Sequence, residues 1–125
     1  DLSIIATGHL VWEALQAAYQ LRKQNIHARV INIHTIKPID QEIIIKAAKE
    51  TGLIITAEEH QIYGGLGSAV AEVLVKFAPV KVHMIGMNDQ FGESGKPEEL
   101  MQKYGMKADN IIQAAIKLIE KHNLH

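Results

Sequence analysis

A strand, a loop and a helix follow one another in residues 53–77, which read LIITAEEHQIYGGLGSAVAEVLVKF. The first five residues are apolar apart from Thr56 and rich in β-branched side chains, which is typical of a buried strand. A polar segment ending in glycines follows, and from Leu66 onward apolar residues recur at spacings of three and four. The apolar face of this helix is expected to consist of Leu66, Ala69, Val70, Val73, Leu74 and Phe77. The segment therefore predicts a strand and the helix that covers it.

The same alternation extends in both directions along the chain. Further strands are expected at 2–6, 28–33 and 80–85, and a helix that Asp40 caps and Gly52 ends should lie between the second and third strands. A helix at about 10–24 should bury a stripe made of Val11, Ala14, Leu15, Ala18 and Tyr19. The last helix, with Asp109 as its cap, should bury Ile111, Ile112, Ala115, Leu118 and Ile119, and a short helix is expected at 97–105.

Strands that alternate with helices predict an α/β fold with three layers, αβα, and helices on both faces of the sheet. The sheet should be open, mainly parallel and built of four to five strands with right-handed crossovers. With 125 residues, of which 47% are hydrophobic, the chain fits a single domain covering residues 1–125. Because the chain enters a strand directly after Asp1 and has no initiator Met, we interpret it as a piece of a larger protein.

Composition narrows the classes of function. The formal net charge is −1 and the 13 Lys and Arg residues are scattered, so no nucleic-acid-binding surface is expected. No apolar run approaches the ~20 residues needed to cross a bilayer, so no membrane association is expected. The chain has no Cys, which rules out disulfides and thiolate chemistry and fits a reducing compartment, so we expect it in the cytoplasm.

The glycine cluster before the third helix invites a comparison with phosphate-binding loops, because helix N-termini bind anions. Residues 65–70 read GLGSAV, and Val70 stands where the dinucleotide fingerprint needs a small residue. A tight loop containing Gly64, Gly65 and Gly67, with Ser68 helping to cap the helix, is therefore favoured. Binding of a nucleotide or a sugar phosphate on the Gly64–Ser68 turn remains the alternative.

Glu58, Glu59 and His60 follow the strand at 53–57, at the sheet edge where α/β proteins generally bind ligands. Acids beside a histidine suit acid–base chemistry, but adjacent residues of an extended segment point in alternate directions. We therefore favour a polar or interface-forming loop over a catalytic one. His9, His34, His60 and His83 lack the spacing that places two imidazoles on one helix face, so no metal site is expected; His83 should lie on the polar side of an edge-like strand.

Three segments together resemble the C-terminal domain of the transketolase family, namely 56–67, 84–86 and 91–100. The Thr7-Gly8 turn and residues 36–40 are also similar to that domain, so the likeness extends over essentially the whole chain. Deoxyxylulose-phosphate synthases and the β subunits of 2-oxo-acid dehydrogenases have a similar terminal domain. The FGESG segment at 91–95 looks more like transketolase than like either relative.

The resemblance implies an enzyme of the pentose phosphate pathway, a cytoplasmic homodimer that transfers a two-carbon ketol unit between sugar phosphates. Its thiamine diphosphate and divalent metal, Mg²⁺, lie between two other domains, so this chain is expected to hold no cofactor and to be inactive alone. Its implied partners are the remaining transketolase domains or subunit. The implied role is domain packing and dimer assembly, with Glu58, Glu59, His60, Gly64, Gly65, Gly67 and Ser68 as an interdomain or anion-contact loop and no catalytic residue.

Overall fold

The computed structural model describes residues 1–34, 38–61, 65–87 and 107–123, without the side chains of 59–61 and 87. Strands and helices alternate in the order β1 (Leu2–Ala6), α1 (Leu10–Lys23), β2 (Ala28–Asn32), α2 (Gln41–Thr51), β3 (Leu53–Gln61), α3 (Leu66–Phe77), β4 (Lys81–Met87) and α5 (Ala108–Asn123). The helix expected at 97–105 and the segment 91–100 lie outside the described residues. In the described part of the chain, no helix is long and apolar enough to cross a bilayer.

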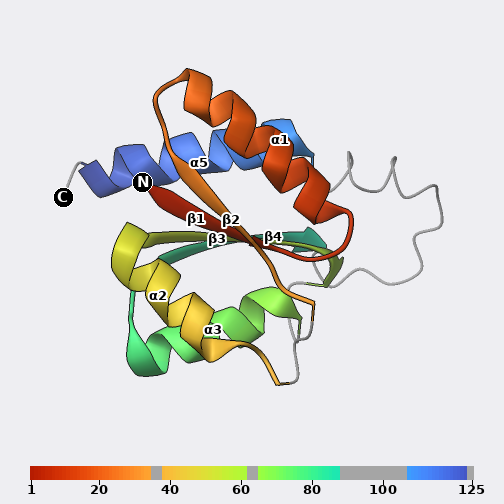
Figure 1. Cartoon of the computed structure of the whole chain (residues 1–125), viewed down its shortest axis with the longest axis vertical. Coiled ribbons are helices and arrows are strands. Elements are labelled where there is room, and N and C mark those ends of the chain that lie inside the picture. Colours follow the sequence, from red (N-terminus) through yellow and green to blue (C-terminus); the bar gives the residue numbers. More distant parts are fainter. Residues whose placement is uncertain (35–37, 62–64, 88–106, 124–125) are drawn as a thin grey trace.

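The described strands form one parallel sheet of four strands in the order β2-β1-β3-β4. Helices α1 and α5 cover one face of this sheet, and α2 and α3 cover the other (Figure 1). The predicted αβα fold with a parallel sheet is thus confirmed. Because the strands are parallel, their carboxyl ends all lie at one edge, which also carries the start of α1, α3 and α5 (Figure 1).

Two hydrophobic cores lie on opposite sides of the sheet, and successive residues of a strand contribute to each in turn. Leu2, Ile4 and Ala6 of β1 point into the core under α1 and α5. Ile5 of the same strand points into the core under α2 and α3. All five residues of β1 are buried, as expected for a central strand covered on both faces.

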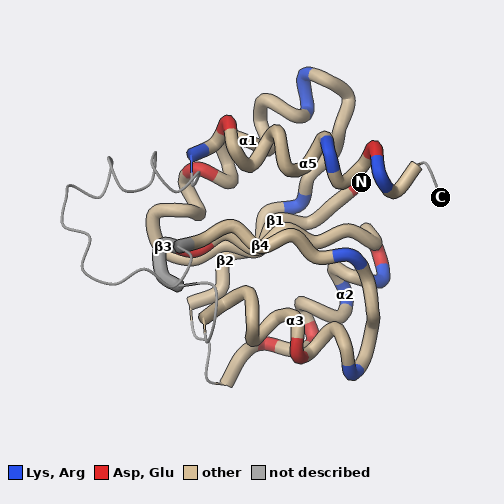
Figure 2. The backbone as a smooth tube through the Cα atoms, turned by 180° about the vertical axis from the view of Figure 1, so that it is seen from behind, with Lys and Arg blue, Asp and Glu red and all other residues tan. Residues whose placement is uncertain are grey.

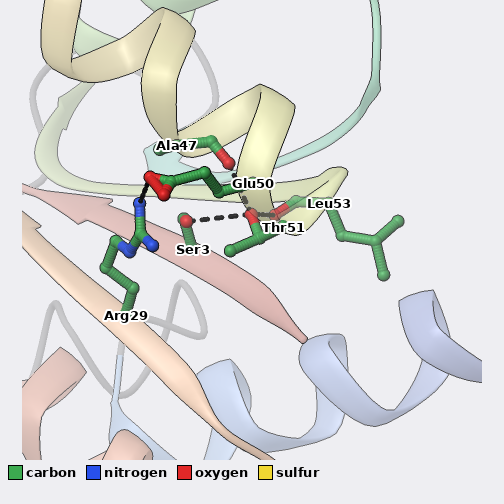
Figure 3. A network of polar contacts seen from close by, with 6 residues as sticks. All are labelled: Ser3, Arg29, Ala47, Glu50, Thr51 and Leu53. Atoms are coloured by element: carbon green, nitrogen blue, oxygen red, sulfur yellow. Dashed lines mark hydrogen bonds and ion pairs between the residues drawn. The ribbon is translucent and has the colours of Figure 1, made fainter.

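At the amino edge of the sheet, side chains join β1 and β2 to the end of α2 (Figure 3). The hydroxyls of Ser3 and Thr51 are 2.9 Å apart, and the Thr51 hydroxyl donates to the carbonyl of Ala47 at 2.8 Å. Arg29 binds Glu50 at 3.1 Å near the surface. The fully buried Ser3 hydroxyl is thus hydrogen-bonded, which removes the penalty of burying it without a partner.

Several predicted boundaries are confirmed and others are corrected. Residues 2–6 form β1 as predicted, and α2 has the predicted Asp40 cap, whose Oδ1 accepts from the N–H of Ile43 at 3.3 Å. Gly52 ends α2 in the left-handed conformation, with φ of 78°. Strand β3 runs to Gln61, past the predicted end at Ala57, because after a register shift Gln61 pairs with Met87 of β4.

The stripe predicted on α1 is confirmed only in part, because Ala14 is buried and Val11 packs on the core. The helix buries Leu10, Ala14, Ala17 and Leu21 against the sheet. Leu15 and Tyr19 are exposed instead. Helix α1 carries apolar residues on two neighbouring faces, and the face with Ala14 and Ala17 lets the helix backbone approach the sheet closely. A spacing rule cannot choose between two such faces.

Two further expectations are corrected at helix ends. Phe77, in the last turn of α3, is exposed rather than buried. Helix α5 begins at Ala108, so Asp109 lies within its first turn rather than capping it. The N–H of Ala108 is bound at 3.0 Å by Oε1 of Glu13, which belongs to α1, 95 residues away in sequence. The stripe predicted on α5 does pack on the core, with Ile111 and Ala115 fully buried.

Candidate functional site

Glu58 lies near the carboxyl edge of the sheet, where β3 passes the start of α3. Its side chain is only 1% exposed. Oε1 accepts a hydrogen bond from the N–H of Leu66 at 2.9 Å, and Oε2 accepts one from the N–H of Gly67 at 2.7 Å. One carboxylate therefore binds two backbone groups at the start of α3.

The two hydrogen bonds give partners both to the backbone N–H groups and to the buried carboxylate. The first N–H groups of a helix have no partner within the helix, and a buried carboxylate needs hydrogen-bond donors. The positive end of the helix dipole also favours a negative charge there. Since hydrogen bonds to charged groups contribute about 1.5–3 kcal/mol each, Glu58 firmly ties β3 to the first turn of α3.

Gly67 permits the close approach of α3 that this contact requires. A Cβ atom at this position would lie 3.0 Å from Sδ of Met84 and 3.1 Å from Oγ1 of Thr56, in neighbouring strands. Thr56 Oγ1 is itself buried and has no hydrogen-bond partner among the residues that the structure describes. The second glycine of the 65–70 pattern thus serves close packing of helix on sheet.

The remaining residues of the predicted loop fall into three groups. Gly65 is the N-cap residue of α3, and Ser68 is half-buried in the first turn of that helix. Glu59 and His60 extend β3, but their side chains lie outside what the structure describes, as does Gly64. The structure therefore brings Glu58 and Gly67 into direct contact. Glu58 itself is buried and bound to the amides of Leu66 and Gly67, so its carboxylate is not exposed for acid–base chemistry.

Sequence reasoning missed the partner role of Leu66 and the contacts of Thr56 and Met84. A usable signal was present: an acid directly follows an apolar strand, and glycines stand at the start of the next helix. That pattern is compatible with an internal cap as well as with a ligand loop. Only the position of α3 on the sheet distinguishes the two.

A bound thiamine diphosphate would need donors for its diphosphate and oxygen or nitrogen ligands for a divalent cation. Among the described residues there is no group of three or more His, Asp or Glu side chains placed to hold a metal ion. The amides of Leu66 and Gly67 are already bound to Glu58. In the described part of the chain, the start of α3 therefore offers neither a group of three metal ligands nor a free amide at Leu66 or Gly67.

Comparison with known proteins gives the family. The family model described as "Transketolase, C-terminal domain" matches residues 1–111. The chain belongs to this family. Its membership agrees with the resemblance seen in the sequence, and it fits the αβα fold.

Relatives of this transketolase C-terminal domain include subunits of several enzymes. It is 45% identical, over 98% of its length, to a 6-deoxy-6-sulfo-D-fructose transketolase subunit of Clostridium sp. (strain MSTE9), of which it covers 38%. It is 42% identical to the 1-deoxy-D-xylulose-5-phosphate synthase of Desulforudis audaxviator (strain MP104C), over 92% of this chain and 18% of that protein. The domain thus spans well under half of each of these relatives.

A solved structure described as a split gene transketolase, an inactive β4 tetramer, has the same fold. It superposes with a TM-score of 0.90 and is 45% identical, covering 96% of this chain and 39% of that one. The high score confirms the sheet order and helix placement of the transketolase C-terminal domain.

Proposed function

We propose that this chain is the non-catalytic C-terminal domain of a thiamine-diphosphate-dependent transketolase and that it supports the packing and dimer assembly of that enzyme. The complete enzyme would use thiamine diphosphate and Mg²⁺ held by other domains to transfer a two-carbon ketol unit between sugar phosphates. Relatives named as transketolase subunits support the assignment, because the matched region makes up 38% of two of them. In those two proteins the matched region is therefore joined to a longer stretch of polypeptide.

The observation that carries the packing role is an apolar face on α1. Trp12, Leu15 and Tyr19 are 62%, 50% and 61% exposed. Their spacings of three and four residues place them on one side of the helix. Exposed aromatic side chains gathered in this way are typical of protein interfaces, where they act as anchors. We infer that the Trp12–Leu15–Tyr19 face contacts the rest of the enzyme.

In this proposal the residues near Glu58 act from within the domain. Glu58 fixes the first turn of α3 and so shapes the carboxyl edge, where Glu59 and His60 follow along β3. The loop remains our candidate for an interdomain contact. Binding of a phosphate or nucleotide on the Gly64–Ser68 turn has less support, because its Leu66 and Gly67 amides are bound to Glu58.

The test uses the complete enzyme, with the cofactor-binding domains present. We expect the double substitution Trp12→Ser and Tyr19→Ser to lower the fraction of assembled enzyme, measured by light scattering, and to reduce ketol transfer with it. Val75→Ser is the matched control, because Val75 is an equally apolar, exposed residue on α3, and it should change neither. Unchanged assembly in the α1 variant would refute the proposed interface.

A second experiment addresses the non-catalytic role. The 125-residue chain alone should show no binding of thiamine diphosphate in calorimetry with Mg²⁺ present. Saturable binding by the chain alone would overturn this part of the proposal and return the Gly64–Ser68 turn to consideration.

A deoxyxylulose-phosphate synthase is the second candidate for the complete enzyme, because synthases of that name are 40–44% identical to this chain. The product that the complete enzyme forms distinguishes a transketolase from a deoxyxylulose-phosphate synthase. Formation of 1-deoxy-D-xylulose 5-phosphate by the complete enzyme, without ketol transfer, would favour the synthase.

A further inference from the structure

A groove of about 270 Å³ lies between β4, the last strand in the order of the described sheet, and helix α5, on the opposite face of the sheet from α3. His83 of β4 and Lys117 and Lys121 of α5 line one part of it. Asn110 and Gln113, closer to the start of α5, line another. Ile85 and Leu118 give it apolar walls. Its volume is just under the range of about 300–1,000 Å³ typical of drug-sized ligands, so it suits a smaller molecule.

Two lysines and no acid stand among the described residues that line the groove. Lys117 and Lys121 are one helical turn apart on the same face of α5 (Figure 2 shows the charged positions). The ion pairs formed by the described residues are Arg29–Glu50 and Lys76–Glu72, and neither involves these lysines. Lys117 and Lys121 therefore bring two positive charges to the groove, and the neighbouring Glu120 forms no ion pair with either and does not line the groove.

His83 responds to that charge. Burial lowers its pKa, and the nearby Lys121 and Lys117 lower it further. The residue opposite His83 on β3 is the uncharged Ile55, so β3 contributes no compensating acid at this register. The imidazole is thus held neutral at pH 7 beside two ammonium groups, an arrangement that an anion would relieve.

We propose that the groove between β4 and α5 binds a small dianion, a phosphate monoester or a dicarboxylate, with the charged group between Lys117, Lys121 and His83. The amide groups of Asn110 and Gln113 would bind polar atoms farther along the ligand. Asn110 is suited to donate, because its Oδ1 already accepts the N–H of Lys107 at 3.2 Å, which leaves its NH₂ group for the ligand.

The proposal has a definite pH dependence. Because the pKa of His83 is lowered from 6.5, the imidazole is neutral at pH 7 and gains a proton only on acidification. Protonation adds a third positive charge, so the affinity for the dianionic form, calculated from the fraction of ligand that is still dianionic at each pH, should strengthen as the pH falls through that pKa. By linkage, a bound dianion should raise the pKa of His83.

The experiment is an NMR titration of the full chain with inorganic phosphate and, separately, with succinate, at constant ionic strength set by NaCl. The imidazole resonances of His83 are assigned by comparison with His83→Asn. We expect saturable shifts, a raised pKa of His83, and affinity lowered about tenfold or more in Lys117→Gln/Lys121→Gln, which loses two charge-assisted contacts. Lys81→Gln, a change at an exposed lysine of β4 that does not line the groove, is the control and should bind as the wild type does.

The two titrations distinguish a phosphate site from a general dianion site and from screening of surface charge. Saturation by phosphate alone assigns a phosphate site, and saturation by succinate as well assigns a site for dianions in general. Shifts that NaCl alone reproduces, or an equal loss in Lys81→Gln, would show only screening of surface charge and would overturn the proposal. Because the readout is binding to this chain, the result is independent of whether the complete enzyme transfers ketol units.

Discussion

Helices α2 and α3 cover the same face of the sheet, yet the first turn of each is held in a different way (Figure 1). Asp40, an exposed residue directly before α2, accepts one hydrogen bond from Ile43 at 3.3 Å. Glu58, a buried residue of β3, accepts two hydrogen bonds from the start of α3, at 2.9 and 2.7 Å. Water can replace an exposed cap but cannot reach a buried one. The two helix ends should therefore differ in how much stability their caps supply.

Glu58→Ala should have the largest effect. It removes both acceptors and leaves the N–H groups of Leu66 and Gly67 buried without partners, which costs about 1–3 kcal/mol for each group. We expect the free energy of unfolding, measured by urea denaturation, to fall by about 3 kcal/mol. Glu72→Ala is the control, because among the described residues Glu72 forms only an exposed pair with Lys76, and its loss should change stability by less than about 1 kcal/mol. An equal loss of unfolding free energy in the two variants would show that Glu58 contributes no more stability than an exposed glutamate.

Gly67→Ala tests the close approach that the buried cap requires. The added Cβ would meet Met84 and Thr56 at 3.0–3.1 Å, and overpacking of this kind costs about 1–3 kcal/mol. Alanine recovers up to about 1 kcal/mol of helix propensity, so we expect a net loss of about 1 kcal/mol in the free energy of unfolding.

A double-mutant cycle with Thr56→Ala sharpens this test. If the contact with Thr56 is the cause, Gly67→Ala should destabilise the protein less when Thr56 is already alanine. Additive effects would mean that the clash lies elsewhere.

Asp40→Ala should also have a small effect, similar in size to that of Gly67→Ala. Loss of an exposed N-cap costs about 1 kcal/mol, and Asp40→Asn, which keeps the acceptor oxygen, should restore most of it. The measurement is again the free energy of unfolding. A loss that matches that of Glu58→Ala would remove the distinction between the local cap and the distant one.

Two buried hydroxyls differ in whether they have a hydrogen-bond partner. Ser3, at the amino edge, is buried but bonds to Thr51 at 2.9 Å. Thr56, beneath α3, is buried with its hydroxyl unpaired among the described residues. At Thr56 the structure has close packing against Gly67 and no hydrogen bond between the hydroxyl and a described residue. This agrees with a close approach of α3 to β3.

The sequence alone determined the alternation of strands and helices, the first strand, and the Asp40 and Gly52 ends of α2. These features depend on side chains within about one helical turn of each other, so the pattern along the chain contains them. The likeness to transketolase C-terminal domains was also readable from ordered segments, and the family match confirms it.

Tertiary structure decided which face of α1 is buried and which acids cap α3 and α5. Glu58 reaches Gly67 across nine residues, and Glu13 reaches Ala108 across 95, because the parallel sheet brings these segments together at one edge. The same assembly places His83 opposite Lys117 and Lys121, which lie far along the chain. Local spacing carries no information about such contacts, since they depend on how each helix packs on the sheet.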